Sequence, residues 1–122
     1  ADGATLRPLG APVPTGGDLP CHVALGAGGG VLCVSHYGVG GVAGVEVGAD
    51  GALGAVTSRV EFAFAGVGPD SARQEASHAH SVELDPLRPG SALVCDLGAD
   101  TLHRLVVTRG VLAVEKDESS PP

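Results

Sequence analysis

The chain has 122 residues, of which 43% are hydrophobic, and its formal net charge is -7 at pH 7. This apolar content is sufficient for a core, but Tyr37, Phe62 and Phe64 are the only aromatic residues, too few for the stacking platforms that bind single-stranded nucleic acid. The negative charge argues against DNA, RNA or an anionic membrane as partner, and no apolar run approaches the roughly 18 residues that span a bilayer.

Short apolar runs bounded by glycine or proline recur along the chain. Each has the length of a strand and lacks a helical period. The predicted strands are 4–9, 21–25, 31–35, 42–47, 60–65, 80–84, 92–95, 102–108 and 111–115. Because Gly residues accept the positive φ of a tight hairpin, the turns between these runs favour antiparallel meanders.

The turns also form a repeat. Asp50-Gly51 and Arg109-Gly110 are each followed by a leucine within three positions, as is Asp2-Gly3. From Asp2 to His22 is 20 residues, whereas from Asp50 to His80 is 30. The second unit therefore has an insertion of about ten residues, at 66–77, and insertions in repeat proteins usually accumulate on the binding face.

The strand at 31–34 is apolar on both faces, so both faces of its sheet must be covered, and no helices are predicted to cover them. Stacked four-stranded sheets satisfy this pattern. We therefore predict an all-β fold, a partial β-propeller built of four-stranded antiparallel blades. Residues 1–20 form the outer strand and connector of a preceding blade, 21–65 a blade, 66–79 an inserted loop carrying Arg73, Gln74 and His78, and 80–122 a blade and connector to a missing blade.

About two and a half blades are expected, fewer than the four or more that close a propeller. We therefore expect a fragment. The expected partners of its outer blade faces are the missing blades of the same propeller. Without them, the exposed apolar surface of these faces would favour self-association.

Residues 73–82 contain the candidate site. His78 and His80 are two apart, so on a regular strand both imidazoles face the same side, and either could act as a base or substrate ligand. We favour His80 because it occupies the repeat position of His22. Arg73 offers a permanent charge for an anionic substrate group, and Gln74 could orient a substrate hydroxyl or pin the loop backbone.

A structural role for the other polar residues is the competing interpretation. His22 is expected to tie adjacent blades by a hydrogen bond to backbone, whereas His36 and His103 are expected to be exposed. Asp96 and Asp100 flank a Gly turn and are interpreted as turn builders rather than acids.

Cysteine and metal chemistry are not indicated. Cys21, Cys33 and Cys95 are odd in number without a CxxC spacing, so they predict buried free thiols in a reducing compartment. A His-x-His pair supplies two zinc ligands, but only Glu75 could be imagined as a third. We expect neither a metal nor a cofactor, and no Gly-x-Ser-x-Gly elbow or Walker loop is present.

Several short motifs stand out along the chain. They are Pro20-Cys21-His22-Val23-Ala24, Ser35-His36-Tyr37-Gly38, Gly68-Pro69 followed by Arg73-Gln74, His78-Ala79-His80-Ser81-Val82, Asp85-Pro86 and Asp96-Leu97-Gly98-Ala99-Asp100. Together these motifs resemble the lactonase family of seven-bladed β-propellers. Departures from the family pattern are Phe64-Ala65, where a His-Glu pair is common, and Ser77, where proline precedes the first histidine.

This resemblance implies a cofactor-independent, cytoplasmic hydrolase of a small anionic sugar lactone such as 6-phosphogluconolactone. The family's proposed catalytic centre also uses arginine and glutamate from later blades, so the chain by itself is expected to be inactive. Two alternatives are a lactonising cycloisomerase of the carboxymuconate type and a non-catalytic interaction module, since propellers often serve as binding platforms.

Overall fold

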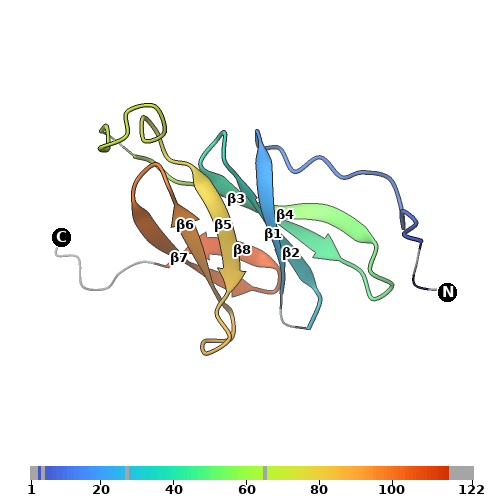
Figure 1. The fold of residues 1–122 in the computed structure, drawn as a ribbon. Coiled ribbons are helices and arrows are strands. Elements are labelled where there is room, and N and C mark those ends of the chain that lie inside the picture. Colours follow the sequence, from blue (N-terminus) through green and yellow to red (C-terminus); the bar gives the residue numbers. More distant parts are fainter. Residues whose placement is uncertain (1–2, 4, 27, 65, 116–122) are drawn as a thin grey trace.

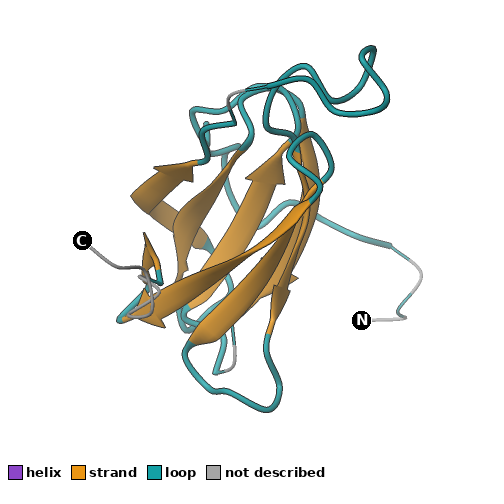
Figure 2. Cartoon of the chain, turned by 90° about the vertical axis from the view of Figure 1, so that its left-hand side faces the viewer, coloured by secondary structure: helices purple, strands orange, loops and turns teal. Residues whose placement is uncertain are grey.

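The computed structural model describes residues 3, 5–26, 28–64 and 66–115. Their regular secondary structure consists of strands alone, which form two four-stranded sheets with loops at both ends (Figure 2). The strands are β1 (Pro20–Leu25), β2 (Val31–His36), β3 (Gly41–Val47), β4 (Leu53–Glu61), β5 (Ala79–Leu84), β6 (Ser91–Asp96), β7 (Thr101–Thr108) and β8 (Val111–Val114). The predicted all-β fold of four-stranded antiparallel blades is confirmed.

Each sheet is a meander in which sequence neighbours pair, β1-β2-β3-β4 and β5-β6-β7-β8. The β7–β8 hairpin shows how the sequence specifies this topology. Thr108 pairs with Val111 across a two-residue turn in which Arg109 and Gly110 have φ of 50° and 79°. Two successive residues with positive φ define the tight turn whose twist matches the flanking strands.

Two strand predictions were wrong. The outer strand of the first blade lies at Leu53–Glu61 rather than 60–65, and its residues alternate between exposed and half-buried. Because an outer strand has one wet face, its sequence is mixed rather than apolar, and the search for apolar runs passed over it. The described residues 5–9 form no strand and are exposed, because no strand lies beside them to complete a ladder.

The core lies between the two sheets, which pack face to face (Figure 1). Val82, Val94 and Leu105 are fully buried there, together with Cys33 and Val42 of the first sheet. Burying side chains of this size stabilises the fold by about 1.5–3 kcal/mol each. Small branched side chains therefore form most of this core, and Phe62 is its aromatic member.

Hydrogen bonds join the blades at both the inner and the outer strands. At the inner strands, the backbone N–H of Val82 donates to His22 Nδ1 (3.4 Å). At the outer strands, Thr57 Oγ1 donates to the carbonyl of Gly110 (2.6 Å), and the N–H of Leu112 donates to Ser58 Oγ (2.9 Å). The predicted role of His22 as a tie between blades agrees with this geometry.

The inserted loop docks against the β6–β7 turn. The N–H of Leu97 donates to the carbonyl of His78 (2.9 Å), and the side-chain amide of Gln74 donates to the carbonyl of Leu97 (3.2 Å). Gly98 permits this close approach, because a Cβ at this position would lie 1.6 Å from the carbonyl oxygen of Ala76.

Replacing Gly98 with alanine forces the loop and the turn apart. We expect Gly98→Ala to lower the free energy of unfolding by about 1–3 kcal/mol, as overpacking does, measured by urea denaturation. Gly30→Ala is the matched control, since a Cβ there meets nothing within 4 Å. Equal effects of the two substitutions would contradict this account of the docking.

Candidate functional site

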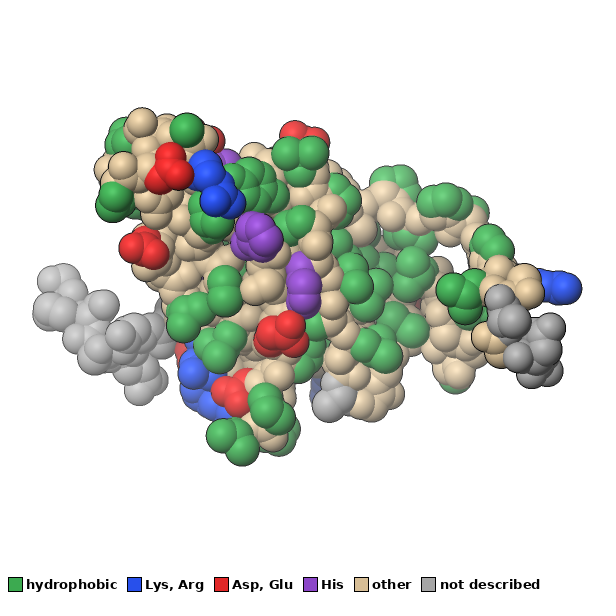
Figure 3. Space-filling view, in the orientation of Figure 1, with side chains coloured by type: hydrophobic (Ala, Val, Ile, Leu, Met, Phe, Trp, Pro, Cys, Tyr) green, Lys and Arg blue, Asp and Glu red, His purple; other side chains and the backbone are tan. Residues whose placement is uncertain are grey.

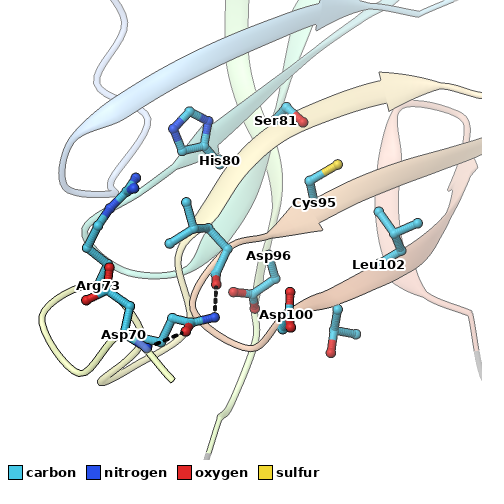
Figure 4. A pocket seen from close by; sticks show the side chains of 11 residues that line it. Asp70, Arg73, His80, Ser81, Cys95, Asp96, Asp100 and Leu102 are labelled. Atoms are coloured by element: carbon cyan, nitrogen blue, oxygen red, sulfur yellow. Dashed lines mark hydrogen bonds between the residues drawn. The ribbon is translucent and has the colours of Figure 1, made fainter. Parts of the chain in front are cut away.

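An open cavity of about 570 Å³ lies where the inserted loop meets the second blade (Figure 4). Its lining includes Asp70, Arg73, Gln74, His80, Cys95 and Asp100. Three of the four residues predicted from sequence as site residues therefore meet at one cavity, and His78 is not among its lining residues. In Figure 3, histidine side chains lie over β5 and β1 on the face shown, with basic and acidic side chains nearby.

Arg73 brings a cation to the cavity. Its side chain is exposed and, among the residues that the structure describes, makes no ion pair or side-chain hydrogen bond. Figure 4 shows its guanidinium and the His80 imidazole turned toward the same part of the cavity. By contrast, Arg88 and Arg104 are both paired with carboxylates. Arg73 is therefore available to bind an anionic group in two-pronged fashion.

His80 occupies a β-bulge, which the sequence repeat did not reveal. In β5, Ala79 pairs with Asp96 and Ser81 with Cys95, so His80 is the extra residue. In β1 the extra residue is Cys21, because Pro20 pairs with His36 and His22 with Ser35. The prediction that His80 occupies the repeat position of His22 was therefore wrong by one residue, and the structural equivalent of His80 is Cys21.

The bulge also separates the two imidazoles. Alternation of side chains holds only on a regular strand, and His78 precedes β5, whereas His80 lies in the bulge. His78 is 6% exposed, while His80 is exposed. The expectation that both rings face the same side was therefore wrong. The His78 ring is buried, whereas the His80 ring lines the cavity.

His78 is held from both ends. Its Nδ1 lies 2.7 Å from the carbonyl oxygen of Tyr37, and its Nε2 lies 2.9 Å from Glu75 Oε1. Both ring nitrogens are therefore engaged in hydrogen-bonding contacts. The backbone N–H of Glu75, followed by the bond from His78, lowers the pKa of the Glu75 carboxyl. This environment suits His78 to holding the loop against the first blade.

Gln74 uses both ends of its amide on the backbone. Its Nε2 donates to the carbonyl of Leu97, and its Oε1 accepts from the N–H of Asp70 at 2.9 Å. Of the two roles considered from sequence, these bonds match the one in which Gln74 holds the loop backbone in place. The loop so held carries Arg73 to the cavity. A contact of Gln74 with substrate stays a prediction.

Asp96 is the buried centre of the docking interface. Its Oδ1 accepts from the N–H of His78 (2.8 Å) and of Ala99 (3.0 Å), and its Oδ2 accepts from Ser77 Oγ and His103 Nε2. Burial by itself would raise the pKa of Asp96, but the four hydrogen bonds outweigh it and lower that pKa. The sequence predicted that Asp96 stabilises the local turn, and its bond to the N–H of Ala99 confirms this. The bonds to Ser77, His78 and His103 were not predicted.

Ser77, Asp96 and His103 have the residue types of a hydrolytic triad but not its order. A triad needs the histidine between serine and aspartate, whereas here Asp96 accepts from both of the others. His103 also stacks on Phe62 with ring centroids 3.8 Å apart. This cluster is therefore a clamp between loop, turn and first blade.

Both other histidines expected to be exposed are covered. His103 is half-buried, and His36 is 2% exposed with its Nε2 2.7 Å from Thr15 Oγ1. Burial lowers the pKa of His36, and the positive charge of Arg59 lowers it further. A hydrogen bond to the Gly41 backbone partly opposes this shift, because it raises the pKa. The exposure prediction failed for His36 because segment 13–17 packs over β2 and β4, where Arg59 Nε donates to the carbonyl of Thr15. It failed for His103 because that ring stacks on Phe62.

The cysteines differ in environment. Cys33 is buried, and burial raises the pKa of its thiol to about 11. Cys21 and Cys95 are exposed free thiols, so the expectation of burial was wrong for these two. Cys95 lines the cavity because it pairs with Ser81, next to the bulge.

No metal centre or membrane helix is found in the described part of the chain. Within these ranges no group of three His, Cys, Asp or Glu side chains is arranged to hold a metal ion, and both nitrogens of His78 are already in contact with other groups. Likewise, residues 3, 5–26, 28–64 and 66–115 include no helix that could cross a bilayer.

Comparison with known proteins identifies the class. Residues 1–119 match the family model described as Lactonase, 7-bladed beta-propeller. The chain therefore belongs to the lactonase family of seven-bladed β-propellers, as its motifs predicted. No curated protein matches it.

Three solved structures are similar to this chain. The periplasmic gluconolactonase PpgL of Pseudomonas aeruginosa is 34% identical, with a TM-score of 0.67 over 75% of this chain and 25% of that one. A protein from Lactobacillus plantarum is 28% identical, with a TM-score of 0.68 over 80% and 27% of the two chains. A putative 6-phosphogluconolactonase from Bacteroides uniformis is 24% identical, with a TM-score of 0.73 over 85% and 29%, and supports the fold alone.

The chain thus spans between 25% and 29% of the length of these structures.

Replacing Asp96 with asparagine tests the clamp. We expect Asp96→Asn to reduce the free energy of unfolding by about 2–3 kcal/mol at pH 7. Because the folded-state pKa is lowered, the carboxylate's contribution is present above the unfolded pKa of about 3.9 and is lost as pH falls through the folded value. The difference between the two proteins should therefore shrink below about pH 4.

Urea denaturation at a series of pH values would measure this difference. Asp100→Asn is the control, since Asp100 is an exposed turn residue in the same cavity. A loss for Asp96→Asn no greater than for Asp100→Asn, or one independent of pH, would disprove the assignment.

Proposed function

We propose that the full-length protein containing this chain hydrolyses a sugar lactone, with His80 as general base and Arg73 as ligand for an anionic group of the substrate. Family membership supports lactone chemistry. The observation that carries the residue assignment is that Arg73 and His80 line one open cavity. Within the described ranges, neither side chain is ion-paired or hydrogen-bonded to another residue.

The reaction requires activation of water beside an ester carbonyl. An imidazole with a free nitrogen removes a proton from water as the oxygen attacks the carbonyl carbon. The ring C–O bond of the lactone then breaks, and the imidazolium returns the proton to the departing ring oxygen. The product is an open-chain hydroxy acid, and all atoms of water are incorporated.

Of the two candidate histidines, His80 fits the role of base. His78 has both nitrogens engaged with Tyr37 and Glu75, so removal of a substrate proton by His78 would first break a buried bond. His80 is exposed on the cavity, and its ring meets that of Tyr37 edge to face. Arg73 complements it with a charge that does not titrate near neutral pH.

The remaining predictions about the whole protein also belong to this proposal. A small anionic sugar lactone fits Arg73, and a cytoplasmic location fits the free thiols of Cys21 and Cys95 in a reducing compartment. The similar gluconolactonase of Pseudomonas aeruginosa is periplasmic, and localising the native protein by cell fractionation would test the cytoplasmic assignment. Further blades would supply the other side of the cavity.

Substitutions of the two cavity residues should have separable effects on lactone hydrolysis by the full-length protein. We expect His80→Ala to reduce kcat by about 10²–10⁴-fold, as loss of a general base does. We expect Arg73→Ala to raise KM by about tenfold or more through loss of a charge-assisted contact. Acid release from gluconolactone and from its 6-phosphate would be followed at constant pH.

Arg109→Ala, which removes an exposed arginine outside this cavity, is the control for Arg73→Ala. Unchanged kinetics in His80→Ala would refute its assignment as base. Absence of any turnover by the full-length protein would favour the interaction module instead.

The fate of solvent oxygen distinguishes hydrolysis from the cycloisomerase reaction, which Arg73 would also serve by holding a substrate carboxylate. Hydrolysis in ¹⁸O-labelled water should place one labelled oxygen in the acid, because water attacks the carbonyl carbon. Cyclisation adds a carboxylate to a double bond and incorporates none. Mass spectrometry of the product measures this, with a single-turnover sample to limit exchange, and unlabelled product would overturn the hydrolase proposal.

A further inference from the structure

Tyr37 brings an aromatic ring from the first blade to the site on the second. It lies in the turn between β2 and β3, and its ring stacks on His78 with centroids 4.1 Å apart and planes 9° from parallel. The same ring meets His80 edge to face, at 5.9 Å and 84°. One side chain thus contacts both the buried and the exposed imidazole.

The position of Tyr37 is itself fixed across the junction between blades. Its carbonyl oxygen accepts from His78 Nδ1 (2.7 Å), and its N–H donates to the carbonyl of Leu19 (2.9 Å). His78 is in turn held by Glu75 from the inserted loop. The ring therefore presents a surface of fixed orientation to the otherwise exposed His80.

The fold alone does not require an aromatic residue here. Leu97 is the structural equivalent in the second blade, because its N–H donates to the carbonyl of His78 as that of Tyr37 donates to the carbonyl of Leu19. Each residue also directly follows the last residue of the second strand of its sheet. An aliphatic side chain thus satisfies the same turn, and the tyrosine ring is an addition on the side that faces the histidines.

We infer that Tyr37 is a positioning residue for His80 in lactone hydrolysis. The inference rests on the proposed function. The edge-to-face contact restricts the rotamers of an imidazole that has no hydrogen-bonding partner among the described residues. A base held in one orientation removes the proton of the attacking water from a preorganised geometry, whereas a freely rotating base must be ordered in each turnover.

Two substitutions at Tyr37 separate the ring from its hydroxyl. Tyr37→Phe keeps both aromatic contacts, and Tyr37→Leu introduces the residue type found at position 97. Both keep the backbone bonds to Leu19 and His78. In the full-length protein we expect Tyr37→Phe to retain wild-type kcat. We expect Tyr37→Leu to lower kcat by about five- to tenfold with KM unchanged, as loss of one aromatic contact predicts.

The decisive comparison is made in a His80→Ala background. If Tyr37 acts through His80, Tyr37→Leu has no further effect on kcat there. An equal reduction in both backgrounds would show that the ring acts through general packing and would overturn the inference. An unaffected kcat in Tyr37→Leu, alongside impaired His80→Ala, would overturn it while leaving the proposed function intact.

A measurement on the unsubstituted protein covers the case in which Tyr37→Leu does not fold. With specifically labelled histidine and tyrosine, NMR should show ring-to-ring NOEs between Tyr37 and His80 as well as between Tyr37 and His78. Absence of the His80 signal would overturn the inference. Conversely, an observed NOE together with normal kinetics in His80→Ala would show that His80 is not the general base. The contact between Tyr37 and His80 would then have no role in catalysis.

Discussion

The burial of the Asp96 carboxylate between the inserted loop and the β6–β7 turn is the interaction on which the site depends. Four donors surround it, and two of them, Ser77 and the His78 N–H, belong to the inserted loop. A buried carboxylate is stable only when its oxygens are hydrogen-bonded, so the loop must close over the β6–β7 turn. That closure brings Arg73 to the same cavity as His80 and makes Gly98 sterically necessary.

The docked loop also gives its two neighbouring histidines different environments. His78 holds Tyr37 and Glu75 and is enclosed by them, whereas the bulge directs His80 into the cavity. The fixed His78 and Tyr37 rings thus support an accessible side chain, that of His80. Catalytic sites commonly combine a reactive group with neighbours whose own positions are fixed by packing and hydrogen bonds.

Sequence patterns predicted the fold class well because they report local physics. Alternating or continuous apolar runs and Gly turns are properties of single strands and hairpins, and the patterns located every strand except β4 to within a single residue at each end. β4 was misplaced because an outer strand carries a mixed sequence. The sequence of 73–80 likewise predicted the location of the cavity. The spacing of the repeat indicates an inserted loop that carries Arg73, and the apolar pattern indicates a strand that starts near His80.

What the sequence by itself determined was therefore the all-β repeat, the family and the neighbourhood of the site. Only the tertiary structure decided which histidine is free. A single bulged residue shifted His80 from the repeat position of His22 to that of Cys21, and contacts from the other blade and segment 13–17 buried His36, His78 and His103. Bulges and contacts between distant segments depend on how sheets pack, and neither has a spacing that can be read along the chain.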